Sequence, residues 1–368
     1  MSHLVHMARW ATRLRSGRAL LIVLPILGAC DAERSTSPSP SAPIEAVGDE
    51  VAAAPELATA SATASCSAPS SARVVKVSSA SALSSALSNA KAGDFIALAD
   101  GKYSGRFRIR NSGTSSNRIT LCSIGGAVLD GGSTSSGYGL HLDGADYWTI
   151  IGVTITKSQK GIMVDGANGN VLQDVTVHEI GHEGIHVRMH SSNNVIRDSH
   201  IYRLGVQYTQ YGEGIYFGSA ESNWCKYTSC KPDASNYNEA IDNLIEDSSA
   251  EAIEAKEGTT GGVIRRNTIL RSGPGRRSDG SQSAAGAIAL RATKYVVESN
   301  TITGAPLNGV VVYSGRDGDN NTFRGNKVEV QSSGYGFQID KSQTGNQVKC
   351  DNVVTAAGKG FANVSCSS

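Results

Sequence analysis

Gly139-Leu-His-Leu-Asp143 returns 22 residues later as Gly161-Ile-Met-Val-Asp165, and this spacing is the clearest indication of the fold. The same pattern recurs further along the chain as Gly184-Ile-His-Val-Arg188, Gly214-Ile-Tyr-Phe-Gly218, Ala252-Ile-Glu-Ala-Lys256, Ala287-Ile-Ala-Leu-Arg291, Gly309-Val-Val-Val-Tyr313 and Gly336-Phe-Gln-Ile-Asp340. A second strand-like pattern, such as Asn170-Val-Leu-Gln-Asp174, alternates with the first. Repeats of this length with several short strands each predict an all-β solenoid.

The repeats can be aligned to separate interior from exterior positions. The second and fourth residues of each repeat are apolar and should face the interior, so the third and fifth should face outward. Equivalent residues of neighbouring repeats should stack about 4.8 Å apart. The outward columns contain His186, Tyr216 and Glu254 at the third position, and Arg188, Lys256, Arg291 and Tyr313 at the fifth.

Lys256 and Arg291 are therefore expected to lie side by side. Two adjacent cations lower the pKa of the lysine and favour an anionic ligand, although Glu254 can offset their repulsion. Glu213 and Glu251 precede two of these strands. The pattern is compatible with a functional site or with a solvated charged face.

Polar residues that end the second pattern are expected to form a structural ladder at a turn. They are Asp174, Asp198, Asp247, Asn267, Asn300 and Asn326. At the other end of the chain, the segment 79–90 places Leu83 four residues before Leu87, which predicts a short amphipathic helix covering the open N-terminal end of the solenoid.

The N-terminal region has a different composition. Residues 1–30 carry arginines before an apolar run that is too short to span a bilayer, which is typical of a signal peptide. Leu27-Gly-Ala-Cys30 resembles the lipobox of bacterial lipoproteins, and the resemblance implies lipidation of Cys30; ordinary secretion is the alternative. Residues 31–65, rich in Ser, Pro and Ala, predict a disordered tether before a domain at 66–368. We expect an exported protein, lipid-anchored to a bacterial membrane in the periplasm or at the cell surface.

Six cysteines remain beyond Cys30, an even number that suggests disulfides in an exported chain. Six cysteines allow fifteen connectivities. Proximity in sequence favours pairing Cys225 with Cys230 and Cys350 with Cys366, which leaves Cys66 with Cys122. The formal net charge of +1 gives no electrostatic support to a nucleic-acid partner. We expect a monomer.

Two insertions, at 219–233 and 272–280, fall on the repeats that carry the charged residues. Long loops in a solenoid usually build the walls of a binding groove. Trp224 and Tyr227 in the first insertion are candidates for contact with sugar rings, with simple cover of the solenoid wall as the alternative.

The region from Ala92 to Cys366 resembles right-handed parallel β-helix proteins of the pectate-lyase-like superfamily. Glu251-x4-Lys256, Asn267, Ala289-Leu-Arg291 and Asn300 resemble a succession found in polysaccharide lyase family 6, the alginate lyase and chondroitinase B group. The resemblance implies that Lys256 is a Brønsted base, Arg291 its partner and Glu251 a ligand of Ca²⁺. The chain departs from that family at Ser249, where a second glutamate is usual, and at Ala292-Thr293, which replaces His-Gly. Glu213 and Glu254 are then candidates for the missing calcium ligands.

These features predict a lyase that cleaves an acidic, uronic-acid-containing polysaccharide by β-elimination. Arg188, His186, Tyr216, Trp224 and Tyr313 would contact the substrate. A uronan epimerase and a non-catalytic, surface-tethered glycan-binding solenoid are the alternatives. A hydrolase would need clustered aspartates, for which only Asp143 and Asp165 are candidates. His182-Glu-Gly-Ile-His186 matches a zinc-protease string but lies in a turn and strand, where the two imidazoles do not share a helix face.

Overall fold

The computed structural model describes residues 66–123, 126–273, 284–305 and 307–368, which belong to one compact unit. The predicted signal peptide, Cys30 and the tether at 31–65 lie outside the described residues, as does most of the insertion at 272–280. Within the described part, no helix has the length and apolar character needed to cross a membrane.

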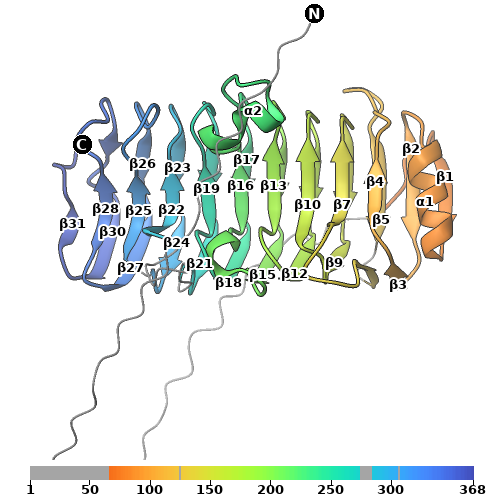
Figure 1. Ribbon diagram of the computed structural model, residues 1–368, viewed down its shortest axis with the longest axis horizontal. Coiled ribbons are helices and arrows are strands. Elements are labelled where there is room, and N and C mark those ends of the chain that lie inside the picture. Colours follow the sequence, from red (N-terminus) through yellow and green to blue (C-terminus); the bar gives the residue numbers. More distant parts are fainter. Residues whose placement is uncertain (1–65, 124–125, 274–283, 306) are drawn as a thin grey trace, which may run out of the picture. The chain divides into compact units, whose positions relative to one another are not determined.

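The chain winds into a solenoid whose strands form three long parallel sheets (Figure 1). The first sheet has 11 strands: β1 (Arg73–Val77), β2 (Asp94–Leu98), β5 (Ile119–Ser123), β8 (Trp148–Ile151), β11 (Val171–Gln173), β14 (Val195–Arg197), β17 (Glu239–Ile241), β20 (Val263–Arg265), β23 (Val296–Glu298), β26 (Thr322–Arg324) and β29 (Gln347–Val348). The second has 10: β3 (Gly101–Ser104), β6 (Ala127–Asp130), β9 (Thr154–Thr156), β12 (Thr176–Ile180), β15 (His200–Leu204), β18 (Leu244–Ser248), β21 (Thr268–Leu270), β24 (Thr301–Thr303), β27 (Lys327–Ser332) and β30 (Val353–Ala357).

The third sheet, here called the site sheet, is formed by the first of the two repeated patterns. Its 10 strands are β4 (Phe107–Ile109), β7 (Tyr138–Asp143), β10 (Lys160–Asp165), β13 (Ile185–Arg188), β16 (Ile215–Phe217), β19 (Ile253–Ala255), β22 (Gly286–Leu290), β25 (Asn308–Val312), β28 (Tyr335–Ile339) and β31 (Gly360–Ala362). Each strand pairs with its neighbours one turn away, which confirms the predicted parallel β-helix.

The interior is filled by the apolar positions of every strand. In the site sheet, Leu140, Ile162, Ile215 and Ile253 are fully buried, as the alternation of the repeats predicts. The predicted helix is α1 (Ala80–Asn89), which begins after the N-cap Ser79 and buries Leu83 and Leu87 beside β1 and β4. Its role as a cap stays a prediction.

An asparagine ladder follows one turn of the solenoid. Each side-chain amide donates to the carbonyl oxygen of the next, in the order Asn243, Asn267, Asn300, Asn326 and Asn352. These bonds satisfy polar groups that would otherwise be buried without partners.

The prediction that Asp174, Asp198 and Asp247 join the ladder is wrong. These aspartates have φ of 53°, 53° and 51°, and they occupy left-handed turn positions rather than ladder positions. A stacked carboxylate could not donate to its neighbour, because it carries no hydrogen.

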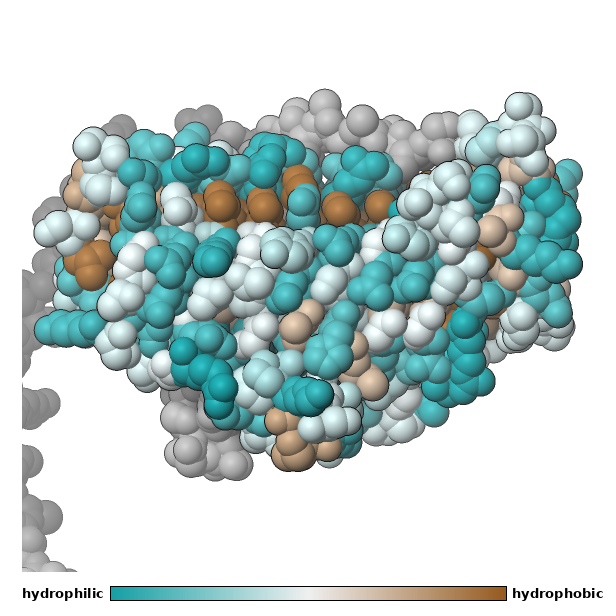
Figure 2. Space-filling view, turned by 90° about the horizontal axis from the view of Figure 1, so that it is seen from above, coloured by the Kyte–Doolittle hydropathy of each residue, from teal (hydrophilic) through white to brown (hydrophobic). Residues whose placement is uncertain are grey.

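Three disulfides join Cys66 to Cys122, Cys225 to Cys230 and Cys350 to Cys366, as proximity in the sequence predicts. The second disulfide closes the insertion that contains η2 (Glu221–Asn223) and α2 (Trp224–Tyr227). Figure 1 shows α2 near the ends of β13 and β16, where Tyr227 of α2 lies against Arg188. A further short helix, η1 (Thr209–Tyr211), precedes β16. Seen from above, the surface is mainly hydrophilic, with a row of apolar side chains along the long axis (Figure 2). Such a row arises because equivalent positions of successive turns stack.

Candidate functional site

The outward columns of the site sheet have the predicted order. Backbone pairing places His186 beside Tyr216, and Tyr216 beside Glu254. At the fifth position, the amide of Lys256 donates to Phe217 and that of Arg291 to Ala255, so the two cationic residues occupy neighbouring turns. The expected adjacency of Lys256 and Arg291 is therefore confirmed.

A cavity of about 720 Å³ lies over these columns. It is lined by most of the predicted site residues, namely Lys256, Arg291, Arg188, His186, Tyr216, Tyr313, Glu213, Glu251 and Glu254. Several outward side chains are nonetheless almost inaccessible: His186 is 3% exposed, Glu254 3% and Glu251 4%. Burial of this many ionisable groups in one cleft is unusual, and it is typical of functional sites.

Lys256 is held by a carboxylate rather than repelled by its cationic neighbour. Its Nζ donates to Glu254 Oε1 over 2.6 Å, and Arg291 Nε lies 3.9 Å from the same oxygen. Burial opposes the charge on Lys256, but the attraction of Glu254 outweighs burial and the repulsion of Arg291, so the pKa of Lys256 is raised. The prediction of a lowered lysine pKa is wrong, because Glu254 offsets the repulsion completely.

Arg291 is oriented by an aromatic ring. Its guanidinium lies over Tyr313, 3.8 Å from the ring centroid, and the hydroxyl of Tyr313 donates to Glu251 Oε1 over 3.2 Å. Stacking on the ring fixes the plane of the guanidinium while its N–H groups stay available to a carboxylate.

Glu213, Glu251 and Glu254 form a buried carboxylate cluster, with one oxygen from each within 4.8 Å of the others. Burial, followed by the negative charge of Glu254, raises the pKa of Glu251 to about 8. Burial and the neighbouring carboxylates raise the pKa of Glu213 well above its usual range. Glu213 Oε2 is buried and has no hydrogen-bond partner. Hard oxygen donors with an unpartnered atom suit Ca²⁺, so these three residues fit the predicted metal.

Tyr216 lies between the cluster and the histidine. Lys256 Nζ is 5.5 Å from its ring centroid, and the ring of His186 packs against it at 4.2 Å. Burial, and then the charges of Glu254 and Glu213, raise the pKa of Tyr216 well above its ordinary value. Its hydroxyl is therefore protonated near neutral pH and can donate a proton or a hydrogen bond.

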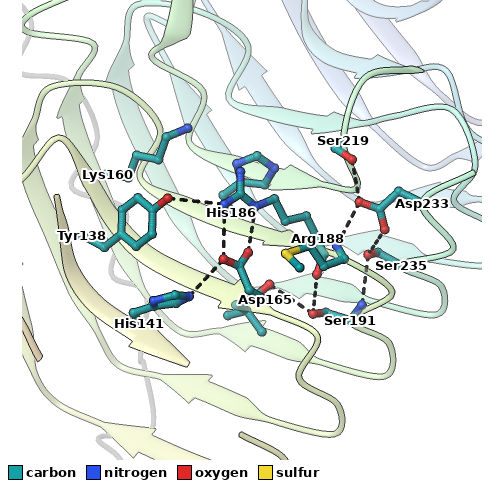
Figure 3. Close-up of polar contacts among 12 residues, drawn as sticks. Tyr138, His141, Lys160, Asp165, His186, Arg188, Ser191, Ser219, Asp233 and Ser235 are labelled. Atoms are coloured by element: carbon teal, nitrogen blue, oxygen red, sulfur yellow. Dashed lines mark hydrogen bonds and ion pairs between the residues drawn. The ribbon is translucent and has the colours of Figure 1, made fainter. Parts of the chain in front are cut away.

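Arg188 sits at the edge of the cavity in a fixed network (Figure 3). Its Nε donates to Asp165 Oδ1 over 2.7 Å, and Asp165 Oδ2 also lies 3.0 Å from His141 Nε2. Tyr227 covers the guanidinium at 4.0 Å. Asp165 is thus held by two partners, and Asp143 pairs with Arg108 and Arg110. Neither aspartate is available as the acid or base of a hydrolase.

The first insertion forms one wall of the cavity, but Trp224 does not line it. Trp224 is 4% exposed, its Nε1 donates to the Ser219 carbonyl over 2.9 Å, and Arg316 lies against its ring. Its ring is therefore a support for the loop and is not accessible to a sugar in this structure. Tyr227, three residues later, is the aromatic residue that faces the cavity.

Asp233 anchors this wall to the site sheet. The fully buried carboxylate accepts hydrogen bonds from the backbone of Met189 and His190 and from the hydroxyls of Ser219 and Ser235 (Figure 3). The contacts fix the turn that follows Arg188 relative to the insertion. No repeat pattern marks Asp233, so its role was not predictable from the sequence.

The two asparagines in the succession shared with polysaccharide lyase family 6 do not belong to the site. Asn267 and Asn300 are buried in the ladder and line none of the cavity. The site instead contains Lys160, whose Nζ lies 2.5 Å from Glu183 Oε1, and Tyr211. Lys160 stands at the entry of its strand, outside the two outward columns, so column alignment alone does not find it. His182 and His186 belong to no metal-ligand cluster of the described residues.

Comparisons with known proteins support the same fold. A model of the Pel9A-like right-handed β-helix region matches residues 64–236, and a model of a right-handed β-helix region matches 232–368. The comparison with curated protein sequences gives no match.

Three solved structures illustrate the similarity. An alginate lyase from Paenibacillus sp. str. FPU-7 is 33% identical, with a TM-score of 0.71 over 79% of this chain and 99% of that one. The pectate lyase Pel9A is 16% identical, with a TM-score of 0.57 over 80% of this chain and 79% of its own. An endo-xylogalacturonan hydrolase from Aspergillus tubingensis is 10% identical, with a TM-score of 0.54 over 79% and 93% of the two chains. The last two similarities concern the fold alone.

Proposed function

Because the chain belongs to the right-handed parallel β-helix proteins of the pectate-lyase-like superfamily, we propose that it is a polysaccharide lyase that cleaves a uronic-acid-containing polysaccharide by β-elimination. The observation that carries the proposal is the convergence of Lys256, Arg291 and Tyr216 in one cavity. The 33% identity to an alginate lyase over nearly the whole of that protein supports it.

In the elimination, a base removes the proton on C5 of the uronate and the C4–O bond breaks as the C4=C5 double bond forms. The leaving oxygen then takes up a proton. Catalysis therefore needs a base, a group that stabilises the charge developing on the carboxylate, and an acid. The cavity offers one residue for each of these tasks.

Lys256 is the proposed base. It is an ammonium ion in the free protein, because its pKa is raised, so it must first lose a proton. Glu254, at 2.6 Å, is positioned to take that proton. A bound sugar excludes water from the cavity, which destabilises the ammonium–carboxylate form of the pair relative to the amine–carboxylic acid form. Substrate binding therefore promotes proton transfer from Lys256 to Glu254.

Arg291 is the proposed partner of the uronate carboxylate. An arginine binds a carboxylate through two parallel N–H groups, and its stacking on Tyr313 keeps that fork in place. Tyr216 is the proposed acid, because its raised pKa keeps the hydroxyl protonated until the leaving oxygen develops charge.

Glu213, Glu251 and Glu254 would hold a calcium ion, which would add positive charge beside the substrate carboxylate. With calcium bound, Glu254 would be a ligand of the ion and not the acceptor of the Lys256 proton, so the proton transfer to Glu254 applies to the calcium-free protein. Addition of Ca²⁺ to protein stripped with a chelator should raise the melting temperature, and Glu213→Gln should abolish the rise. An unchanged melting temperature in the parent protein would remove calcium from the account.

The direct test is to incubate the protein with alginate, pectate and glycosaminoglycans and to follow the ultraviolet absorbance of the new double bond. A rise in absorbance with one of these polymers is expected. Altered sugar configuration without absorbance would identify an epimerase, and binding without either change would identify a glycan-binding protein.

A further inference from the structure

A second cavity, of about 560 Å³, lies over β4, β7 and β10 on the same sheet. It shares Arg188 and Tyr227 with the cavity that contains Lys256, but none of Lys256, Arg291 and Tyr216 lines it. The second cavity therefore neighbours the proposed catalytic site without belonging to it.

The charges around the second cavity favour an anion. Arg108 and Arg110 share the single carboxylate of Asp143, so one positive charge is left in excess. Arg106 adds another positive charge, since its Nη2 donates to the hydroxyl of Ser136 and it has no carboxylate partner among the described residues. A groove lined by one sign of charge attracts ligands of the opposite sign.

The buried members of the cavity do not cancel this excess. Asp165 is neutralised by Arg188, and His141 is bonded to the same carboxylate (Figure 3). Tyr138 stands beside them, with its hydroxyl 3.4 Å from Arg188 and its ring edge-on to His141 at 5.0 Å. An aromatic ring and a fixed polar network next to exposed guanidinium groups are suited to a ring-shaped ligand that carries a carboxylate.

Tyr227 and Arg188 form the partition between the two cavities. The stack is 4.0 Å from guanidinium to ring centroid, and Arg188 is itself fixed by Asp165. Tyr227 belongs to the insertion that the Cys225–Cys230 disulfide closes. A ligand that occupies both cavities must pass over this stack along the axis of the solenoid.

We propose that the second cavity is a distal subsite, which binds another uronic-acid residue of the polysaccharide that Lys256 cleaves. This proposal rests on the proposed function, which identifies the polymer as a uronan. Arg106 and Arg108 bind the carboxylate of that residue, and Tyr138 supports its ring. β4 and β19 are five turns apart on the site sheet, roughly 24 Å at the usual strand spacing. The distal subsite therefore acts on long chains and has no effect on short ones.

Calorimetric titration of the full chain carrying Lys256→Ala tests the subsite without turnover. The probes are disaccharides and hexasaccharides of mannuronate, guluronate and galacturonate. A hexasaccharide should bind at least tenfold more tightly than its disaccharide, and adding Arg106→Ala with Arg108→Ala should remove that gain without weakening disaccharide binding. Arg266→Ala with Arg324→Ala is the matched control and should leave the gain intact, because it removes two exposed arginines, one just after β20 and one at the end of β26, away from the site sheet.

Equal affinity for both lengths, or a length dependence that survives loss of Arg106 and Arg108, overturns the distal subsite. That result leaves the lyase proposal standing if the unmodified chain still produces the double bond. A different result is binding that depends on length and on the two arginines while the unmodified chain produces no double bond with any uronan. That result supports the distal subsite and overturns the proposal that the chain is a lyase. Absence of binding by every probe overturns the subsite.

Discussion

Lys256 Nζ lies 2.6 Å from Glu254 Oε1, and neither side chain is more than 14% exposed. This pair accounts for the raised pKa of the lysine despite its burial and its cationic neighbour Arg291. If Lys256 acts as a free amine, the pair must exchange a proton before each elimination. The pair therefore links the acid–base state of the cavity to its proposed activity.

Replacement of Glu254 by Gln should move the pH dependence of cleavage. The change removes the anion that raises the pKa of Lys256 while burial and Arg291 continue to lower it. The rising limb of kcat against pH should shift to lower pH, with a lower maximum because the proton acceptor is lost. A pH–rate series with both proteins gives the comparison, and an unmoved limb would contradict the role assigned to the pair.

Replacement of Tyr216 by Phe should lower kcat by a factor of about 10² to 10⁴, the usual contribution of a general acid, with little change in KM. The ring and its contacts with His186 stay in place, so the melting temperature should not change. Tyr202→Phe, on the second sheet, is the control. Activity of Tyr216→Phe within a factor of two of the parent would show that another group protonates the leaving oxygen.

Replacement of Glu251 by Gln should alter the pH dependence of stability. The pKa of this carboxyl is about 8 in the folded chain, whereas a glutamate in the unfolded chain has a pKa of about 4.3. Between these values the folded state binds the extra proton, so the free energy of unfolding falls as pH rises, by up to about 1.4 kcal/mol per unit. Melting curves from about pH 5 to pH 8 should show a smaller fall for Glu251→Gln. An equal fall in the free energy of unfolding for both proteins would contradict the burial of Glu251 in its un-ionised form.

Replacement of Asn300 by Ala should destabilise the chain without disabling the site. It leaves ladder groups of Asn267 and Asn326 unsatisfied, at a cost of about 1 to 3 kcal/mol in the free energy of unfolding. Denaturant titration measures the loss, and kcat per folded molecule should stay at the parent value. A selective loss of activity or of calcium response would contradict the purely structural role assigned to Asn300.

The repeats predict the fold well because every turn of a solenoid has the same alternation of interior and exterior residues. Alternation of Ile215 with Tyr216 fixes which side faces the core, and the register then places Tyr216 beside Glu254 without further information. The same logic brought Lys256 and Arg291 together. It failed for the pKa of Lys256, because the direction of the shift depends on a 2.6 Å contact between Lys256 and Glu254, two residues apart on the same turn, which the order of the columns does not determine.

The insertions around the cavity were less predictable than the site-sheet residues that line it. Trp224 and Tyr227 are equivalent candidates in the sequence, but α2 turns the first inward and the second toward Arg188. Asp233 and Lys160 fall outside the outward columns, so only the folded chain relates them to the cavity. Insertions follow their own contacts rather than the repeat, and their geometry cannot be inferred by alignment.

The role of Lys256 as the base is tested by the initial rate at which Lys256→Ala forms the double bond from a uronan that the parent protein cleaves. We expect a loss of at least about 10²-fold in the rate per folded molecule, because the proposed base is removed. The melting temperature should also fall, since the buried carboxylate of Glu254 loses its cationic partner, so the folded fraction is measured alongside the rate. Lys327→Ala, an exposed lysine on β27, should retain the parent rate. A Lys256→Ala variant that cleaves as fast as the parent protein would show that this lysine does not remove the C5 proton.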